Sequence, residues 1–107
     1  MITGDYNEHR IYVDGQEIDL ERSLRLANHS PTGLSWGYLG SGPSQTALAL
    51  LLEFSATDVE ALAWYREFKE EIVSKIPQEN FTMSNERVID WLDARRLFSR
   101  EFEQGEH

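Results

Sequence analysis

One segment of the sequence combines glycines and hydroxyl side chains immediately before an apolar run. It spans residues 36–45 and reads Trp-Gly-Tyr-Leu-Gly-Ser-Gly-Pro-Ser-Gln. Free backbone N–H groups at the start of a helix can hold a phosphate or a carboxylate. However, no lysine follows the last glycine, and the third glycine of a dinucleotide-binding loop is missing. A structural turn that caps a helix is therefore the favoured interpretation, and an anion, nucleotide or peptide site is the alternative.

Nucleophilic catalysis at this segment would require Ser41 or Ser44 beside a histidine that acts as a base. The sequence has three histidines, His9, His29 and His107, and the last of them ends the chain. His29 precedes the glycine segment, but its spacing does not require contact with a serine. Hydrogen bonding within its own loop explains His29 more simply. We therefore expect no catalytic residues, and an enzyme is not the favoured class.

Metal and cofactor sites are not predicted. The chain has no cysteine, which excludes disulfides, thiolate metal sites and a cysteine nucleophile. Neither His-x-x-x-His nor Glu-x-x-His occurs, so no helix presents histidine ligands at metal-binding spacing. We expect no metal and no cofactor.

Charge and length restrict the classes of partner. The 107 residues carry a formal charge of −9, which repels nucleic-acid phosphates and anionic lipid at long range. Direct nucleic-acid binding is therefore disfavoured. The longest apolar run covers residues 47–52, far short of the roughly 20 residues of a membrane span. No secretory signal precedes it, so we expect a cytoplasmic protein without a membrane segment.

The elements that would position the glycine segment begin with a β-hairpin. Residues 10–13 are rich in β-branched and aromatic side chains, Asp14-Gly15 suits a two-residue turn, and residues 16–20 alternate polar with apolar. Short strands are also predicted at 24–26 and 34–38. A loop rich in turn formers is predicted at 28–33, and another loop at 78–83.

Three helices are predicted after the hairpin. The first should start at Pro43, with Gly42 or Ser41 as its cap, and should be buried on every side. The second should start at a capping box and run to about residue 75. A third helix is expected from about residue 85 to 102. The apolar faces of the second and third helices comprise Ala61, Tyr65, Phe68, Ile72 and Ile76, and Val88, Trp91, Leu92, Phe98 and Phe102.

The predicted fold class is α+β, a small antiparallel sheet packed on three helices. The sheet would comprise the N-terminal hairpin plus one or two short strands. A chain of this length suits one domain, so residues 1–107 are predicted to form a single unit. Its ends, about 1–8 and 103–107, are predicted to fray.

Several segments together resemble a family of uncharacterised small bacterial, archaeal and phage proteins, the domain of unknown function 6166. The resemblance rests on Asn28-His29-Ser30-Pro31-Thr32-Gly33, the Trp36 to Gln45 segment, the apolar run after it, and residues 61–69 and 81–84. The family pattern usually has glycine at Leu39 and tryptophan at Phe81. Because members occur on phages and plasmids, the resemblance implies an accessory or regulatory role.

The function expected from these observations is a non-enzymatic binding or regulatory module that engages a protein partner. The alternative is a protein that binds a small anion, or an enzyme, using the Gly40–Pro43 turn and the helix that follows. The sequence leaves the oligomeric state open. The candidate ligand or partner surface comprises Asn28, His29, Trp36, Tyr38, Gly40, Ser41, Gly42 and Gln45.

Overall fold

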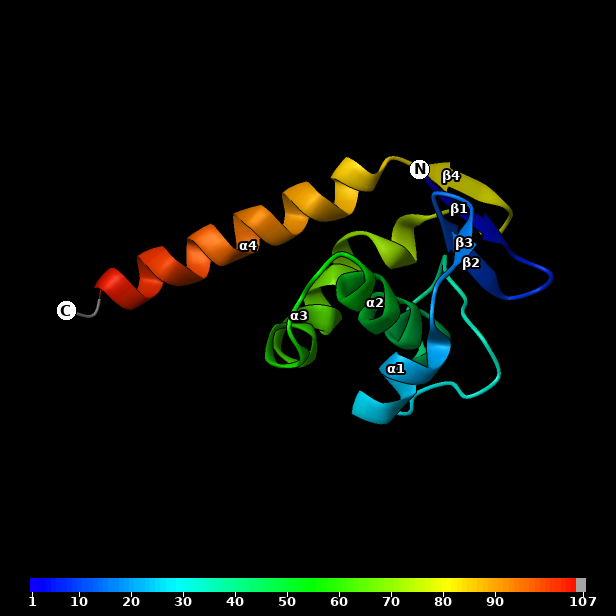
Figure 1. Cartoon of the computed structure of the whole chain (residues 1–107), viewed down its shortest axis with the longest axis horizontal. Coiled ribbons are helices and arrows are strands. Elements are labelled where there is room, and N and C mark those ends of the chain that lie inside the picture. Colours follow the sequence, from blue (N-terminus) through cyan, green and yellow to red (C-terminus); the bar gives the residue numbers. More distant parts are fainter. Residues whose placement is uncertain (106–107) are drawn as a thin grey trace.

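The computed structural model describes residues 1–105, and the side chains of residues 1–99. It has the predicted α+β architecture: a four-stranded antiparallel sheet packs against helices, with strand order β3-β2-β1-β4. The C-terminal part of helix α4 extends beyond the rest of the molecule, as Figure 1 shows. Four α-helices are present in the described residues rather than three.

The elements follow one another in a simple order along the chain. The strands are β1 (Ile2–Asp5), β2 (Arg10–Val13), β3 (Gln16–Glu17) and β4 (Phe81–Met83). The helices are α1 (Leu20–Leu26), α2 (Ser41–Glu53), α3 (Asp58–Glu71) and α4 (Asn85–Gly105), with a short 3-10 helix, η1 (Val73–Lys75), after α3.

The predicted hairpin is confirmed as β2 and β3. Asp14 and Gly15 have φ angles of 53° and 86°, the left-handed values that a two-residue turn of this kind requires. The second arm is shorter than predicted, because Asp19 caps a helix by accepting a hydrogen bond from the Glu21 N–H. The prediction of a strand at 24–26 is therefore wrong, and these residues belong to α1.

The N-terminus is part of the sheet, and the prediction that residues 1–8 fray is wrong. Strand β1 lies between β2 and β4 and pairs antiparallel with both. Ile2 is fully buried in the core beneath it. One strongly apolar residue in a four-residue strand leaves little local signal, and its partners lie elsewhere in the chain.

Two further predictions along the chain are wrong. Residues 34–38 form no strand, although Leu34 and Trp36 are buried. Their backbone bonds to α2 and η1 instead, and Gly37 has a φ of 88°. Conversely, the segment predicted as a loop at 78–83 contains strand β4.

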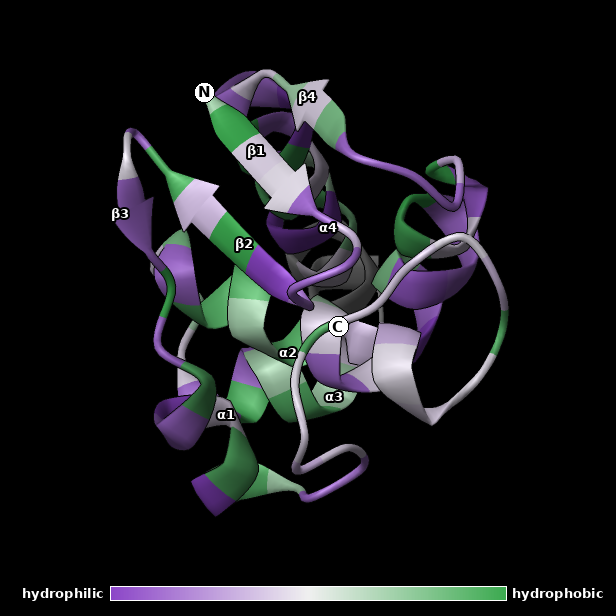
Figure 2. Ribbon diagram, turned by 90° about the vertical axis from the view of Figure 1, so that its right-hand side faces the viewer, coloured by the Kyte–Doolittle hydropathy of each residue, from purple (hydrophilic) through white to green (hydrophobic). Residues whose placement is uncertain are grey.

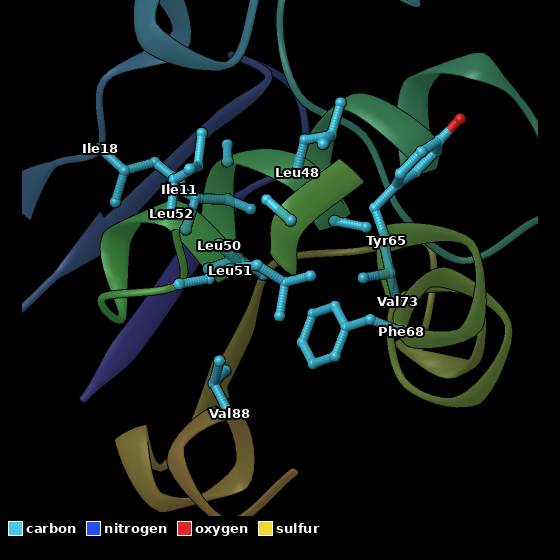
Figure 3. Close-up of a cluster of buried hydrophobic side chains, with 14 of the residues drawn as sticks. Ile11, Ile18, Leu48, Leu50, Leu51, Leu52, Tyr65, Phe68, Val73 and Val88 are labelled. Carbon is cyan, nitrogen blue, oxygen red and sulfur yellow. The ribbon is translucent and has the colours of Figure 1, made fainter. Parts of the chain in front are cut away.

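Helix α2 forms the centre of the core. It starts at Ser41, with Gly40 as its cap, so Pro43 lies within the first turn rather than at its start. Every residue from Gly42 to Leu52 is buried, as predicted for a helix that is apolar all round. Figure 3 shows its leucines among side chains of the sheet, α3, η1 and α4, and Figure 2 shows the apolar colouring concentrated there.

Helices α3 and α4 confirm their predicted starts but not their full apolar faces. The capping box of Thr57 and Glu60 is present at α3, which ends at Glu71 before η1. On α4, Val88 and Leu92 are buried, whereas Phe98 is 58% exposed. Phe102 lies outside the side chains that the structure describes.

Helix α4 includes residues 103–105, which were predicted to fray, and residues 106–107 lie outside the described part. Among the helices of residues 1–105, none has the length and apolar character that crossing a membrane requires.

Burial of β1 leads to a stability prediction. We expect Ile2→Ala to lower the free energy of unfolding by about 2–4 kcal/mol, because it opens a cavity under the sheet. Val59→Ala, at a position 77% exposed, should change it by less than about 0.5 kcal/mol. Urea denaturation of both variants provides the measurement, and equal effects would contradict the position of β1.

Candidate functional site

The predicted surface separates into a buried framework and an exposed loop. Trp36, Gly42 and Gln45 are buried, so they cannot contact a partner directly. Tyr38 and Ser41 are exposed. Of the remaining members, Asn28 is exposed, and His29 and Gly40 are half-buried.

Gln45 holds the loop at 28–33 against the helices. Its side-chain oxygen accepts hydrogen bonds from the backbone N–H groups of His29 at 2.8 Å and Ser30 at 3.1 Å. Its side-chain NH₂ donates to the hydroxyl of Ser23 in α1, which in turn donates to the Leu20 carbonyl. The amide is fully buried, and these bonds satisfy it. Gln45 is thus a structural residue that joins α2, α1 and the loop.

Trp36 fixes the segment that leads into the exposed loop. Its indole N–H donates to the Glu79 carbonyl at 2.9 Å, and its ring packs edge-on against Phe81 with centroids 4.9 Å apart. Gly4 lies directly against both rings, where a Cβ would collide with them. The Thr46 hydroxyl accepts a hydrogen bond from the Ser35 N–H and donates one to the Ser35 carbonyl.

The loop formed by residues 37–41, called here the Tyr38 loop, rests on this framework. The Gly37 N–H donates to the Val73 carbonyl, and the Gln78 side chain donates to the Gly37 carbonyl. The ring of Tyr38 covers Gly40, and its hydroxyl lies against Gly42. Leu39, at the tip, is 67% exposed. A fixed loop therefore presents a large apolar side chain to solvent.

The start of α2 has two features that an anion site would use. No side chain caps the helix, and the Lys69 ammonium group of α3 donates to the Ser44 hydroxyl at 3.1 Å. Among the described residues, no carboxylate forms an ion pair with Lys69. Ser44 already donates to the Gly40 carbonyl. The phenol of Tyr38 lies against Gly40 and Gly42 and leaves less space for an anion to approach them.

The ring of His29 packs against an aromatic side chain and, among the side chains that the structure describes, is not paired with a serine nucleophile. Its ring lies 5.2 Å from the ring of Tyr65, and its Nε2 atom is buried without a hydrogen-bond partner. No hydrogen bond joins it to Ser41 or Ser44 in the described residues. Within the same part of the chain, no three His, Asp or Glu side chains gather closely enough to hold a metal ion.

Two apolar grooves on the surface were not predicted from the sequence. One, of about 340 Å³, lies between η1 and β4 and is called here the β4 groove. It is lined by Ile72, Lys75, Ile76, Pro77, Phe81, Thr82, Met83 and Arg87. The alternation of apolar, polar and apolar residues at 81–83 was the available signal for the strand beside it.

The second groove, of about 380 Å³, lies between α3 and α4. Its lining comprises Glu71, Trp91, Ala94, Arg95 and Phe98. Ion pairs hold these two helices together: Arg95 donates to Glu67 at 2.6 Å, and Arg96 binds both carboxylate oxygens of Glu60 at 2.9 Å. Helix α4 is thus fixed by charged side chains beyond the point where its buried apolar contacts end.

The family comparison covers most of this framework. A family model described as a family of unknown function (DUF6166) matches residues 3–94. The chain belongs to this family. No curated protein and no solved structure matched the chain.

The segment that matches DUF6166 contains some of the surface features completely and one of them only in part. The framework, the Tyr38 loop and the β4 groove all fall within residues 3–94. The groove at α4 instead includes Arg95 and Phe98, which lie beyond the matched segment. Of these surface features, the Tyr38 loop and the β4 groove lie entirely within the matched segment.

The role of Gln45 can be tested by removing its amide. We expect Gln45→Leu to lower the free energy of unfolding by about 2–4 kcal/mol, because two backbone N–H groups and the Ser23 hydroxyl lose their partner. Gln16→Leu, the same substitution at an exposed position, serves as the control. Chemical denaturation should separate the two variants. A similar loss in both would refute the framework role.

A pH dependence follows from the capping box of α3. The hydrogen bonds from Arg96 are the main reason that the pKa of Glu60 falls from 4.5 to about 2. Since the folded state binds the proton more weakly, the stabilisation is complete above pH 4.5 and is lost as the pH falls towards 2. We expect Glu60→Gln to cost about 1–2 kcal/mol at neutral pH.

The measurement is the free energy of unfolding of the wild type and Glu60→Gln between pH 7 and pH 2. The gap between them should close at the acidic end. Glu70→Gln, which alters an exposed carboxylate on the same helix, should show no such closing gap. A difference for Glu60→Gln that stays constant with pH would contradict the ionic origin of the effect.

Proposed function

We propose that this protein is a non-enzymatic binding module that engages a protein partner through the Tyr38 loop. The observation that carries the proposal is the exposure of Leu39 and Tyr38 on a loop whose base is fixed. Large apolar side chains on a preorganised loop favour protein recognition, because little conformational entropy is lost on binding.

The framework beneath the loop supports this assignment. The polar groups of buried Trp36 and Gln45 form hydrogen bonds with backbone or side-chain partners within the chain. Trp36 fixes the segment that leads into the Tyr38 loop, Gln45 fixes the neighbouring loop at 28–33, and the tip of the Tyr38 loop remains exposed. In this proposal, the sequence segment that suggested a ligand site serves to present Leu39 rather than to enclose a small molecule.

Charge and composition bear on the environment and on the kind of partner. The formal charge of −9 disfavours direct contact with nucleic acid and gives the surface long-range attraction for basic proteins. The absence of cysteine suits a reducing compartment. We propose a cytoplasmic protein whose regulatory role is exerted on another protein.

Binding of a small anion is the second candidate function. The observation that favours it is the Lys69 ammonium group beside the uncapped start of α2. A cation at the positive end of a helix dipole is unfavourable on its own, and an anion between them would relieve the repulsion.

The loop proposal can be tested with a charge introduced at its tip. We expect Leu39→Asp to reduce capture of a specific partner from a nuclease-treated lysate by at least about tenfold, as for an apolar contact at the centre of an interface. Val59→Asp, a matched change at an exposed apolar position on α3, should retain the partner. Direct titration of the purified partner then gives the affinity.

Two outcomes would contradict the loop proposal. One is a partner captured equally by wild type and Leu39→Asp. The other is a melting temperature raised by inorganic phosphate or a nucleotide in wild type but not in Lys69→Met, which would favour the anion site.

A further inference from the structure

Strand β4 forms one edge of the sheet, and the β4 groove runs beside it. Figures 1 and 2 both show β4 as the outer strand on the side away from β3. None of the described segments pairs with its outer edge. A strand edge with unpaired backbone groups can accept an extended chain.

The turn of the hairpin determines which backbone groups face which neighbour. Because the turn has two residues, Val13 and Gln16 exchange hydrogen bonds across it. The Ile18 N–H donates to the Ile11 carbonyl, so Ile11 faces β3 as well. Alternate residues of a strand face opposite neighbours, and Tyr12, which lies between them, therefore faces β1.

The same alternation carries across to β4. Tyr12 pairs with Thr3, so the two residues that flank Thr3 in β1 face β4. Their partners are the first and last residues of β4, which face back towards β1. Thr82, the middle residue, is left with its N–H and carbonyl directed away from the sheet. One donor and one acceptor are thus available at the edge, next to the groove.

The groove also has a charge that contrasts with the whole molecule. Lys75 and Arg87 line it, and neither forms an ion pair with any carboxylate in the described residues. The floor between them is apolar, with Ile72 and Ile76 on one side and Met83 on the other. In a chain of net charge −9, two unpaired cations around an apolar groove select carboxylates locally.

We propose that the β4 edge and its groove bind an extended acidic segment of another protein. The segment adds a strand beside β4 through the N–H and carbonyl of Thr82. An apolar side chain of the segment enters the groove, and its carboxylates pair with Lys75 and Arg87. This site is separate from the Tyr38 loop and does not depend on the function proposed for that loop.

The probe is an acetylated, amidated octapeptide of alternating valine and aspartate, compared with the same peptide carrying lysine in place of aspartate. In ¹⁵N-labelled protein, we expect the aspartate peptide to shift the amide signals of Thr82 and its neighbours. It should bind at least about tenfold more tightly than the lysine peptide. Equal affinity of both peptides, or shifts confined to other regions, would overturn the proposal.

Charge reversal provides the matched test. Lys75→Glu combined with Arg87→Glu should reverse the preference between the two peptides. Both side chains are exposed, so folding should be preserved. Arg25→Glu combined with Arg66→Glu makes the same change in net charge at exposed sites outside the groove and should leave the preference unchanged. An unchanged preference in the groove variant would exclude charge selection at this site.

Main-chain pairing is tested with two N-methylated forms of the aspartate peptide, methylated at the odd or at the even residues. Only one edge of a bound strand faces β4, so one form should lose binding and the other should retain it. Retention by both would exclude strand addition. Leu39→Asp should leave peptide binding unchanged, which separates failure of this site from failure of the loop proposal.

Discussion

Burial of α2 on every side is the constraint on which the rest of the structure depends. A helix surrounded by protein cannot leave polar side chains unpaired without a cost of about 1–3 kcal/mol each. Its two fully buried hydrogen-bonding side chains, Gln45 and Thr46, therefore bond to neighbouring segments. Those bonds fix the two irregular stretches before the helix, which have no strand or helix of their own.

The sequence could predict elements that have a local signal, but not elements that depend on partners far away in the chain. Local signals predicted the turn at Asp14-Gly15, the capping box at Thr57 and the all-round apolar character of α2, and the structure confirms them. Strands β1 and β4 were missed, because each is short and its partners are distant in the chain.

Trp36 shows the corresponding limit for the candidate site. Its residue type and the glycines after it suggested a binding surface. Its indole instead bonds to Glu79, 43 residues further along the chain, and packs on Gly4 and Phe81. Aromatic and glycine residues serve close packing as readily as recognition, and only the tertiary contacts separate these roles. The exposed members of the motif could be separated from the buried ones only in the folded chain.

The division between framework and surface also determines which groups of this domain remain available to other molecules. The buried aromatic and amide groups of the framework are committed to internal contacts, as Trp36 and Gln45 illustrate. Among the described residues, groups without an internal partner remain at the tip of the Tyr38 loop and along the outer edge of β4. Both are held by segments that bond to η1 or flank it, since Gly37 donates to Val73 and Lys75 lines the groove. A change in η1 would therefore reach both surfaces at once, which makes this short helix the structural link between them.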